Sequence, residues 1–161
     1  MSWSQGIYKV QNREKYLGTR DKSFSLTMQD PFYRSSWEQR LMYKFDTDPN
    51  ILKWGYENII IPYMNYDFKR KEMRQHRYLM DFYIEYIGKD STIKKMLIEV
   101  KPRKDESAPI KPKIKNQKAM RRYMYEASTY IKNQNKWKSA RQFCKSNNME
   151  FKIMSEKDIF V

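Results

Sequence analysis

The stretch "KKMLIEV" at residues 94–100 constrains the fold more than any other part of the chain. It contains an almost continuous apolar run, formed by Met96, Leu97, Ile98 and Val100, although successive side chains of a strand point to opposite faces. Apolar residues on both faces are typical of a strand that is covered on both sides. We therefore predict that this stretch is the central strand of a sheet.

The neighbouring patterns predict the order helix, three strands, helix, strand, and hence a mixed α/β (α+β) fold. Trp37, Leu41, Met42 and Phe45 form one apolar stripe on a helix that begins near Ser35 and ends at the turn "DTDPN". The three strands are predicted at residues 58–64, 77–87 and 94–100. Helical spacing then extends to about residue 147, as one helix or as two broken near "KNQN", and "MEFKIM" predicts the last strand.

Two segments are predicted to lie outside these elements. Residues 1–30 carry turn residues and scattered aromatic side chains without a sustained period, so we assign them to an irregular N-terminal extension of a domain that spans residues 31–161. Residues 103–115 are charged and contain two prolines, which predicts a mobile loop.

The charge of the chain indicates the kind of partner. Its 33 Lys and Arg residues against 19 Asp and Glu residues give a formal net charge of +14, which favours nucleic acid over the alternative of a merely soluble basic protein. An anionic membrane is a weaker alternative, because the basic residues are not gathered on one amphipathic helix. The candidates for contacts with a DNA backbone lie in two segments: Lys69, Arg70, Lys71, Arg74 and Arg77, and Lys111, Lys113, Lys115, Arg121 and Arg122.

Several kinds of site are excluded by what the sequence lacks. Cys144 is the only cysteine, which excludes an internal disulfide and a cysteine-based zinc site and fits a reducing compartment. His76, the only histidine, falls in a predicted loop, and no glycine-rich phosphate loop is present, which argues against triad hydrolysis and nucleoside-triphosphate chemistry. No apolar run has the length of a signal peptide or membrane span, so we expect a soluble intracellular protein.

Glu99 and Lys101 place two opposite charges on one face of the predicted central strand, about 6–7 Å apart. If that face is buried, each charge is costly unless something compensates it. Two interpretations are open: an ordinary salt bridge on the sheet, or a pair of catalytic residues.

The catalytic interpretation includes Asp81, on the strand that is predicted to pair with the one carrying Glu99. Carboxylates are natural ligands of a hard divalent cation such as Mg²⁺, and a cation between the two would offset their burial. Lys101 could then position or deprotonate the attacking water of phosphodiester hydrolysis, or hold a phosphate oxygen. On the second predicted helix, Gln134, Lys136 and Lys138 can lean toward the same place.

Glu38 also has two interpretations. Ser35-x-x-Glu38 is a capping box, in which the glutamate reaches back to the start of its helix. From the same helix, the Glu38 carboxylate could also reach a metal held at the sheet.

The order of these motifs resembles that of a known nuclease superfamily. Asp81 followed by Glu99-Val100-Lys101 is similar to the signature of the PD-(D/E)xK nucleases, with Met80 in place of a proline that supplies no ligand. More narrowly, "EKYLG", "YRSSWEQRLMYKFDTDPNILKW", "IIIPY", "HRYLMDF", "LIEVKP" and "NQNKWKSARQFCKSNNMEFKIMSEKD" resemble the head completion nucleases of T4-like tailed bacteriophages, whose fold is similar to TnsA-type transposon endonucleases. Gly55-Tyr56 stand where small polar residues are expected, which leaves the role of Glu57 open.

The resemblance implies a restriction-endonuclease-like core and a metal-dependent DNA nuclease. Asp81 and Glu99 would bind Mg²⁺ or Mn²⁺ with help from the Val100 carbonyl, Lys101 would be the catalytic lysine, and Glu38 would be the acidic residue of the first helix. The implied partners are duplex DNA and phage portal or neck proteins, without a membrane. The implied setting is the host cytoplasm during phage assembly, or the virion, at head completion and head–tail joining after DNA packaging.

Two alternatives belong to other functional classes. One is a non-catalytic basic structural protein of the virion that binds DNA or the portal. The other is a transposon-type strand-cutting endonuclease subunit.

Overall fold

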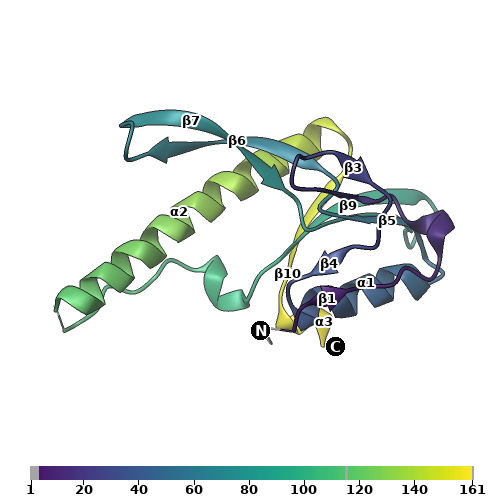
Figure 1. Ribbon diagram of the computed structural model, residues 1–161, viewed down its shortest axis with the longest axis horizontal. Helices are drawn as coiled ribbons and strands as arrows, with labels where there is room; N and C mark the ends of the chain where they lie inside the picture. The colour runs from purple at the N-terminus through teal and green to yellow at the C-terminus, as the bar shows by residue number, and fades with distance from the viewer. Residues whose placement is uncertain (1–3, 115, 161) are drawn as a thin grey trace.

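The computed structural model describes residues 4–114 and 116–160 (Figure 1). Lys115 of the predicted basic segments, residues 1–3 of the predicted extension and residue 161 lie outside the described residues. The elements are β1 (Gly6–Ile7), the 3-10 turn η1 (Arg13–Lys15), β2 (Thr19–Arg20), β3 (Leu26–Thr27), β4 (Phe32–Tyr33), α1 (Ser36–Thr47), β5 (Ile51–Tyr56), β6 (Ile60–Asp67), β7 (Glu72–Leu79), β8 (Phe82–Ile87), β9 (Ile93–Val100), η2 (Arg103–Glu106), α2 (Gln117–Ser146), β10 (Glu150–Met154) and α3 (Glu156–Ile159).

The main sheet has the strand order β10-β9-β8-β5, so β9 lies inside it, parallel to β10 and antiparallel to β8. The even-numbered side chains of β8 and β9 join the core that includes α1, where the rings of Phe45 and Phe82 meet edge to face at 5.2 Å. The odd-numbered side chains face the second core, where Leu97 packs with Ala140 and Cys144 of α2. The prediction of a central strand covered on both faces is confirmed.

Helix α1 begins and ends where the sequence predicts. The side chain of Ser35 caps it by accepting a hydrogen bond from the Glu38 N–H, and the predicted stripe of Trp37, Leu41, Met42 and Phe45 is buried. The helix ends at Thr47, before the Asp48-Pro49 turn.

The segment at residues 77–87 is not one strand, as the alternation predicts, but the end of β7 and the whole of β8. β7 pairs with β6, whereas β8 pairs with β5 and β9. The chain changes sheets at Met80 and Asp81, where the Met80 N–H donates to the Ile59 carbonyl at 3.1 Å. The alternation of apolar and polar side chains within one segment cannot show that the chain passes from one sheet to another, because other segments determine its pairing partners.

Two other predictions about strands are wrong. β5 is missing from the predicted order, because Trp54, Gly55 and Tyr56 are consecutively buried and show no alternation. The predicted basic loop that contains His76 is mostly strand β7, in which His76 pairs with Tyr63 and stacks on its ring at 5.4 Å. A run of charged residues forms a strand here because β6 supplies its backbone partners.

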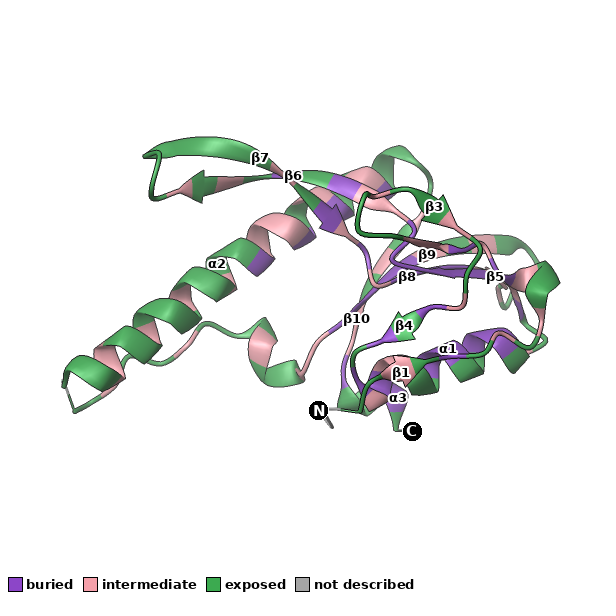
Figure 2. Ribbon diagram, viewed as in Figure 1, coloured by how far each residue is buried: buried purple, intermediate pink, exposed green. Residues whose placement is uncertain are grey.

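Helix α2 is a single helix of 30 residues that continues through "KNQN". Tertiary contacts support it there: Asn133 is buried, and the side-chain amide of Asn135 donates to Asn65 of β6 at 3.0 Å. The first half of α2 and the far end of the β6–β7 hairpin extend away from the sheet as two exposed arms (Figures 1 and 2). Among the described helices, none is both long and apolar enough to cross a membrane.

The predicted N-terminal extension contains only short elements and packs into the main core. Tyr8 and Tyr16 are buried, and both rings contact Trp54, with centroids at 6.1 and 4.9 Å. The buried carboxylate of Asp46 accepts hydrogen bonds from the Tyr8 hydroxyl and from the N–H groups of Gln11 and Asn12. This carboxylate of α1 therefore anchors the N-terminal segment, and the division of the chain at residue 31 stays a prediction.

Replacing Asp46 with Asn should lower the free energy of unfolding by about 3 kcal/mol, because one acceptor oxygen becomes an amide that faces N–H donors. Urea denaturation of the two proteins measures the difference. Asp48→Asn, just after the same helix, is the matched control: its amide oxygen can still accept from the Asn50 N–H, so stability should change by less than about 0.5 kcal/mol. Equal stabilities of Asp46→Asn and the parent would contradict the anchoring role.

The thiol of Cys144 should be inert in the folded protein, because it is 2% exposed and burial raises its pKa to about 11. Because folding favours the neutral thiol, Cys144 stabilises the fold at low pH. This contribution is lost as pH rises above about 9, the ordinary pKa of a thiol, toward the raised pKa of about 11. We expect a disulfide reagent at about pH 8 to react with Cys144 only at the rate of unfolding, and quickly in concentrated urea. Rapid reaction in native buffer would show that the packing of α2 on the sheet opens.

Candidate active site

Asp81 and Glu99 meet at the end of the β8–β9 ladder. The antiparallel register pairs Phe82 with Ile98, so one further step places Asp81 opposite Glu99. The Asp81 carboxylate takes the place of the next backbone acceptor: its Oδ2 accepts a hydrogen bond from the Val100 N–H at 2.7 Å. The sheet thus ends in two acidic side chains from neighbouring strands, as the sequence predicts.

These two carboxylates interact unfavourably in the folded chain. Glu99 is 4% exposed. Burial and then the negative charge of Glu99 raise the pKa of Asp81 well above its usual range, with a further contribution from Glu38. The Val100 N–H and the Lys101 ammonium act in the opposite direction. The site therefore holds more negative charge than its fixed partners balance.

Both carboxylate oxygens of Glu99 have a partner. Its Oε1 lies 3.7 Å from the Lys101 ammonium nitrogen, so the predicted ion pair is present. Its Oε2 accepts a hydrogen bond of 2.6 Å from the Tyr78 hydroxyl. Burial, followed by the charges of Glu99 and Asp81, raises the pKa of Tyr78, so this hydroxyl stays a proton donor. Sequence reasoning missed Tyr78, whose only signal was its place in an alternating strand.

Glu38 reaches back to the start of its helix, as predicted, and its proposed contact with a metal stays a prediction. The Ser35 side chain accepts from the Glu38 N–H at 3.2 Å, and the Glu38 carboxylate accepts at 2.8 Å from the backbone N–H of Arg34, one residue before the cap. The same Oε2 accepts from the Tyr56 hydroxyl at 3.0 Å. Because its charge also acts on Asp81, Glu38 belongs to the same acidic site, on the side of α1.

Glu57 holds the backbone of the site. It is buried and forms an ion pair with Arg34. Its N–H donates to the Asp81 carbonyl at 3.0 Å, and its own φ of 47° is in the left-handed region, where few non-glycine residues lie. The sequence left the role of Glu57 open. In the structure Glu57 supports the backbone at Asp81, where the chain passes from β7 to β8.

Of the three side chains of α2 that the sequence directs to the site, Lys136 lies over the ring of Tyr78, the partner of Glu99. Its ammonium nitrogen is 5.1 Å from the ring centre of Tyr78 and 5.7 Å from that of Tyr63. Burial lowers the pKa of Lys136, and Glu99 is the largest influence that raises it. Lys138 is exposed on the same helix.

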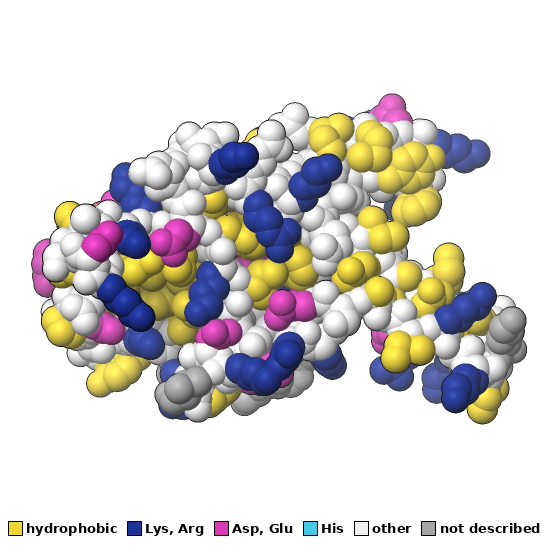
Figure 3. Space-filling model, turned by 180° about the vertical axis from the view of Figure 1, so that it is seen from behind, with side chains coloured by type: hydrophobic (Ala, Val, Ile, Leu, Met, Phe, Trp, Pro, Cys, Tyr) yellow, Lys and Arg dark blue, Asp and Glu magenta, His cyan; other side chains and the backbone are white. Residues whose placement is uncertain are grey.

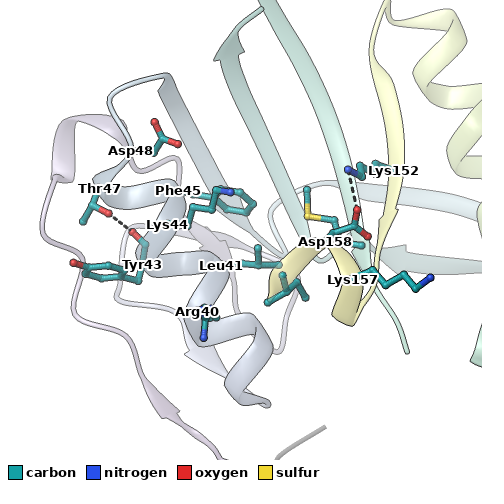
Figure 4. A pocket seen from close by; sticks show the side chains of 12 residues that line it. Arg40, Leu41, Tyr43, Lys44, Phe45, Thr47, Asp48, Lys152, Lys157 and Asp158 are labelled. Carbon is teal, nitrogen blue, oxygen red and sulfur yellow. Dashed lines mark hydrogen bonds and ion pairs between the residues drawn. The ribbon is translucent and has the colours of Figure 1, made fainter. Parts of the chain in front are cut away.

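Two hollows flank the core, and they differ in their relation to the site. One, of about 670 Å³, lies between α2 and the segment after β9 and is lined by Lys101, Lys104 and Arg122 among others. The other, of about 630 Å³, lies between α1 and the C-terminal α3 and contains none of the candidate site residues (Figure 4). Lys101 lines the first hollow, in which Lys104 and Arg122 lie beside Asp105 and Glu126.

The surface seen in Figure 3 is rich in Lys and Arg, and a notch separates the end of the β6–β7 hairpin from the start of α2. Exposed apolar side chains accompany the basic ones on the hairpin, among them Met64, Phe68 and Met73. The first predicted basic segment therefore lies on the hairpin, and Arg121 and Arg122 of the second lie on α2, whereas Lys111 and Lys113 lie in the segment before that helix.

Comparison with known proteins gives two matches. The family model for the TnsA-like endonuclease N-terminal domain matches residues 48–156, which include β5 to β10 and hence Asp81, Glu99 and Lys101. The chain is also 36% identical over 151 residues to the head completion nuclease of Enterobacteria phage T4, a match that covers 94% of this chain and 90% of that protein. The chain belongs to the TnsA-like endonuclease family, within the restriction-endonuclease-like nucleases, and is a homologue of the phage T4 head completion nuclease.

Proposed function

We propose that this protein is a metal-dependent deoxyribonuclease that hydrolyses phosphodiester bonds in duplex DNA. The observation that carries the proposal is the meeting of Asp81, Glu99 and Lys101 at one end of the sheet. A salt bridge alone would explain Glu99 and Lys101, but it does not explain a second, half-buried carboxylate placed beside them.

The residues present fit a hard divalent cation. Within residues 4–114 and 116–160, no three or more Asp, Glu, His or Cys side chains converge as a metal cage. Mg²⁺ and Mn²⁺ do not need one: Mg²⁺ is commonly held by one or two carboxylates and completes its shell with water and phosphate oxygens. Asp81 and Glu99 would hold the ion, together with the Val100 carbonyl, and their uncompensated charge is what a cation would offset. When bound, it would lower the pKa of the attacking water and stabilise charge on the phosphate.

The other side chains of the site orient these groups. Lys101 is 30% exposed in its side chain, so its ammonium can reach a phosphate oxygen or the attacking water while it remains near Glu99. The Tyr78 hydroxyl fixes one oxygen of Glu99, and the Val100 N–H fixes one oxygen of Asp81. Glu38 accepts a hydrogen bond from Tyr56 and adds a negative charge to the site from the side of α1.

Duplex DNA is the substrate that the surface favours. The hairpin and α2 carry most of the predicted backbone contacts, and Lys101 and Lys104 line the hollow beside the site. A two-stranded ribbon such as β6–β7 has the width that the major groove admits. Strong dependence of binding on salt follows from this charge.

The relative's name supports a role in phage head completion. We place the nuclease in the host cytoplasm during assembly, or in the virion, acting on DNA after packaging so that head and tail can join. Portal or neck proteins are the further partners expected in that setting.

Asp81→Asn should stabilise the metal-free protein, because it removes a half-buried charge beside the buried Glu99 and keeps an acceptor for the Val100 N–H. A carboxyl with a raised pKa in the fold destabilises it as pH rises above about 4, so the gain should be present at about pH 8 and vanish below about pH 4. We expect on the order of 1 kcal/mol, or a rise in Tm of about 2–4 °C, measured in EDTA. A fall in Tm would mean that the Asp81 charge is compensated.

Lys101→Ala and Asp81→Ala should each reduce cleavage by about 10²-fold or more, because each removes a group that acts on developing charge. Loss of covalently closed circular DNA, compared with linear duplex, measures this in Mg²⁺, in Mn²⁺ and in EDTA, where the parent should also be inactive. Glu85→Gln is the matched control: it changes a carboxylate further along β8 that accepts from Tyr83, and it should cleave like the parent.

DNA that is bound but never cut with any metal would support a structural DNA- or portal-binding protein instead. Cleavage only in the presence of a partner recombinase would support the transposon-type subunit. Cleavage by Lys101→Ala at the parent rate would contradict the assigned site.

A further inference from the structure

Lys136 lies on α2, one residue before the buried Trp137, and enters the region between the helix and the β6–β7 hairpin. Trp137, Asn133 and Ala140 form the buried stripe of the helix, so Lys136 lies at its edge. Its side chain is half-buried, whereas Lys132 and Lys138 are exposed. Of these lysines, only Lys136 is directed at the core of the nuclease.

Two tyrosine rings hold the ammonium group. The rings of Tyr63 and Tyr78 are nearly perpendicular, at 82°, with centroids 6.2 Å apart, and the Lys136 nitrogen lies near both. Aromatic faces attract a cation, and they position it without neutralising it. The same Tyr78 donates to Glu99, so Lys136 reaches the acidic site through one side chain.

The Lys136 ammonium forms no ion pair with any side chain that the structure describes. Burial lowers its pKa, while the charges of Glu99 and Asp81 favour its cationic form. A half-buried cation that faces a site without a fixed counter-ion is suited to an anionic ligand.

We propose that Lys136 is a further catalytic residue that binds a non-bridging phosphate oxygen of the strand to be cut. This inference rests on the proposed nuclease function. The two oxygens of Glu99 lead to two cations from different elements, Lys101 directly and Lys136 through Tyr78. The phosphate gains negative charge as water attacks, and an ammonium fixed before the reaction stabilises that charge.

The position of Lys136 would also link DNA binding by the two arms to cleavage at the sheet. It lies where α2 meets the hairpin, next to Asn135, which bonds to Asn65. A strand held between the two arms would lie beside this junction. Lys136 would therefore position the DNA backbone at the site, and Lys101 would act on the reacting groups.

The experiment compares Lys136→Met with Lys138→Met, which removes the same charge from an exposed position two residues along the helix. Binding to a duplex in EDTA, measured at several salt concentrations, reports phosphate contacts without cleavage. Lys136→Met should reduce the salt slope by about 0.9, the loss of one contact, and Lys138→Met should not change it. In Mg²⁺, Lys136→Met should lower kcat by about 10²–10³-fold at an unchanged Tm.

Lys136→Arg is a second variant, which tests the role of the charge if methionine at this position disturbs the fold. It keeps a cation over the two rings and should restore the salt slope. Cleavage and salt slope at parent values in Lys136→Met would overturn the role of Lys136 and leave the nuclease intact. If neither the parent nor any variant cleaves DNA, the proposed nuclease function fails. The phosphate contact is tested separately by binding, and equal salt slopes of Lys136→Met and Lys138→Met would overturn it.

Discussion

The hydrogen bond from the Val100 N–H to the Asp81 carboxylate ends the β8–β9 ladder, and the arrangement of the site depends on it. It forms because the chain leaves the β6–β7 hairpin and enters the main sheet at Met80 and Asp81. Glu57 holds this crossing from the other side through the Asp81 carbonyl. With the crossing in place, a carboxylate occupies the position of a backbone acceptor, and Glu99 lies directly opposite.

The same geometry carries an electrostatic cost. Two carboxylates lie close together in a largely buried place, with a third from α1 within range. Such a cluster is tolerated when the rest of the molecule is well packed. Here the packing comes from the aromatic core around Trp54, Phe45 and Phe82, to which the N-terminal segment adds Tyr8 and Tyr16. The segment that the sequence predicts as an irregular extension thus supports the part of the fold that holds the site.

The two arms differ from this body in physical character. The first half of α2 and the end of the hairpin contribute few buried side chains (Figure 2). A helix without tertiary packing is only marginally stable in water, so the arms are the parts whose order benefits most from a ligand. Lys136 lies at their junction, where the helix begins to pack against the hairpin.

Much of this protein follows from local sequence. The apolar run at residues 96–100 specifies a strand covered on both faces, and Ser35 with the stripe from Trp37 to Phe45 specifies α1. The alternation of Glu99 and Lys101 places both charges on one face, and their ion pair forms. These features depend on neighbours one to four residues away, so a reading of the chain can find them.

Other features depend on partners that are distant in the sequence. The separation of β7 from β8, the strand β5 and the course of α2 through "KNQN" are set by pairing and packing with other segments. Tyr78 and Tyr56 become partners of Glu99 and Glu38 only when strands from different parts of the chain meet. The residue types and their faces were thus readable from the sequence, whereas their convergence on one site required the tertiary fold, because hydrogen bonding and burial between distant segments leave no local period.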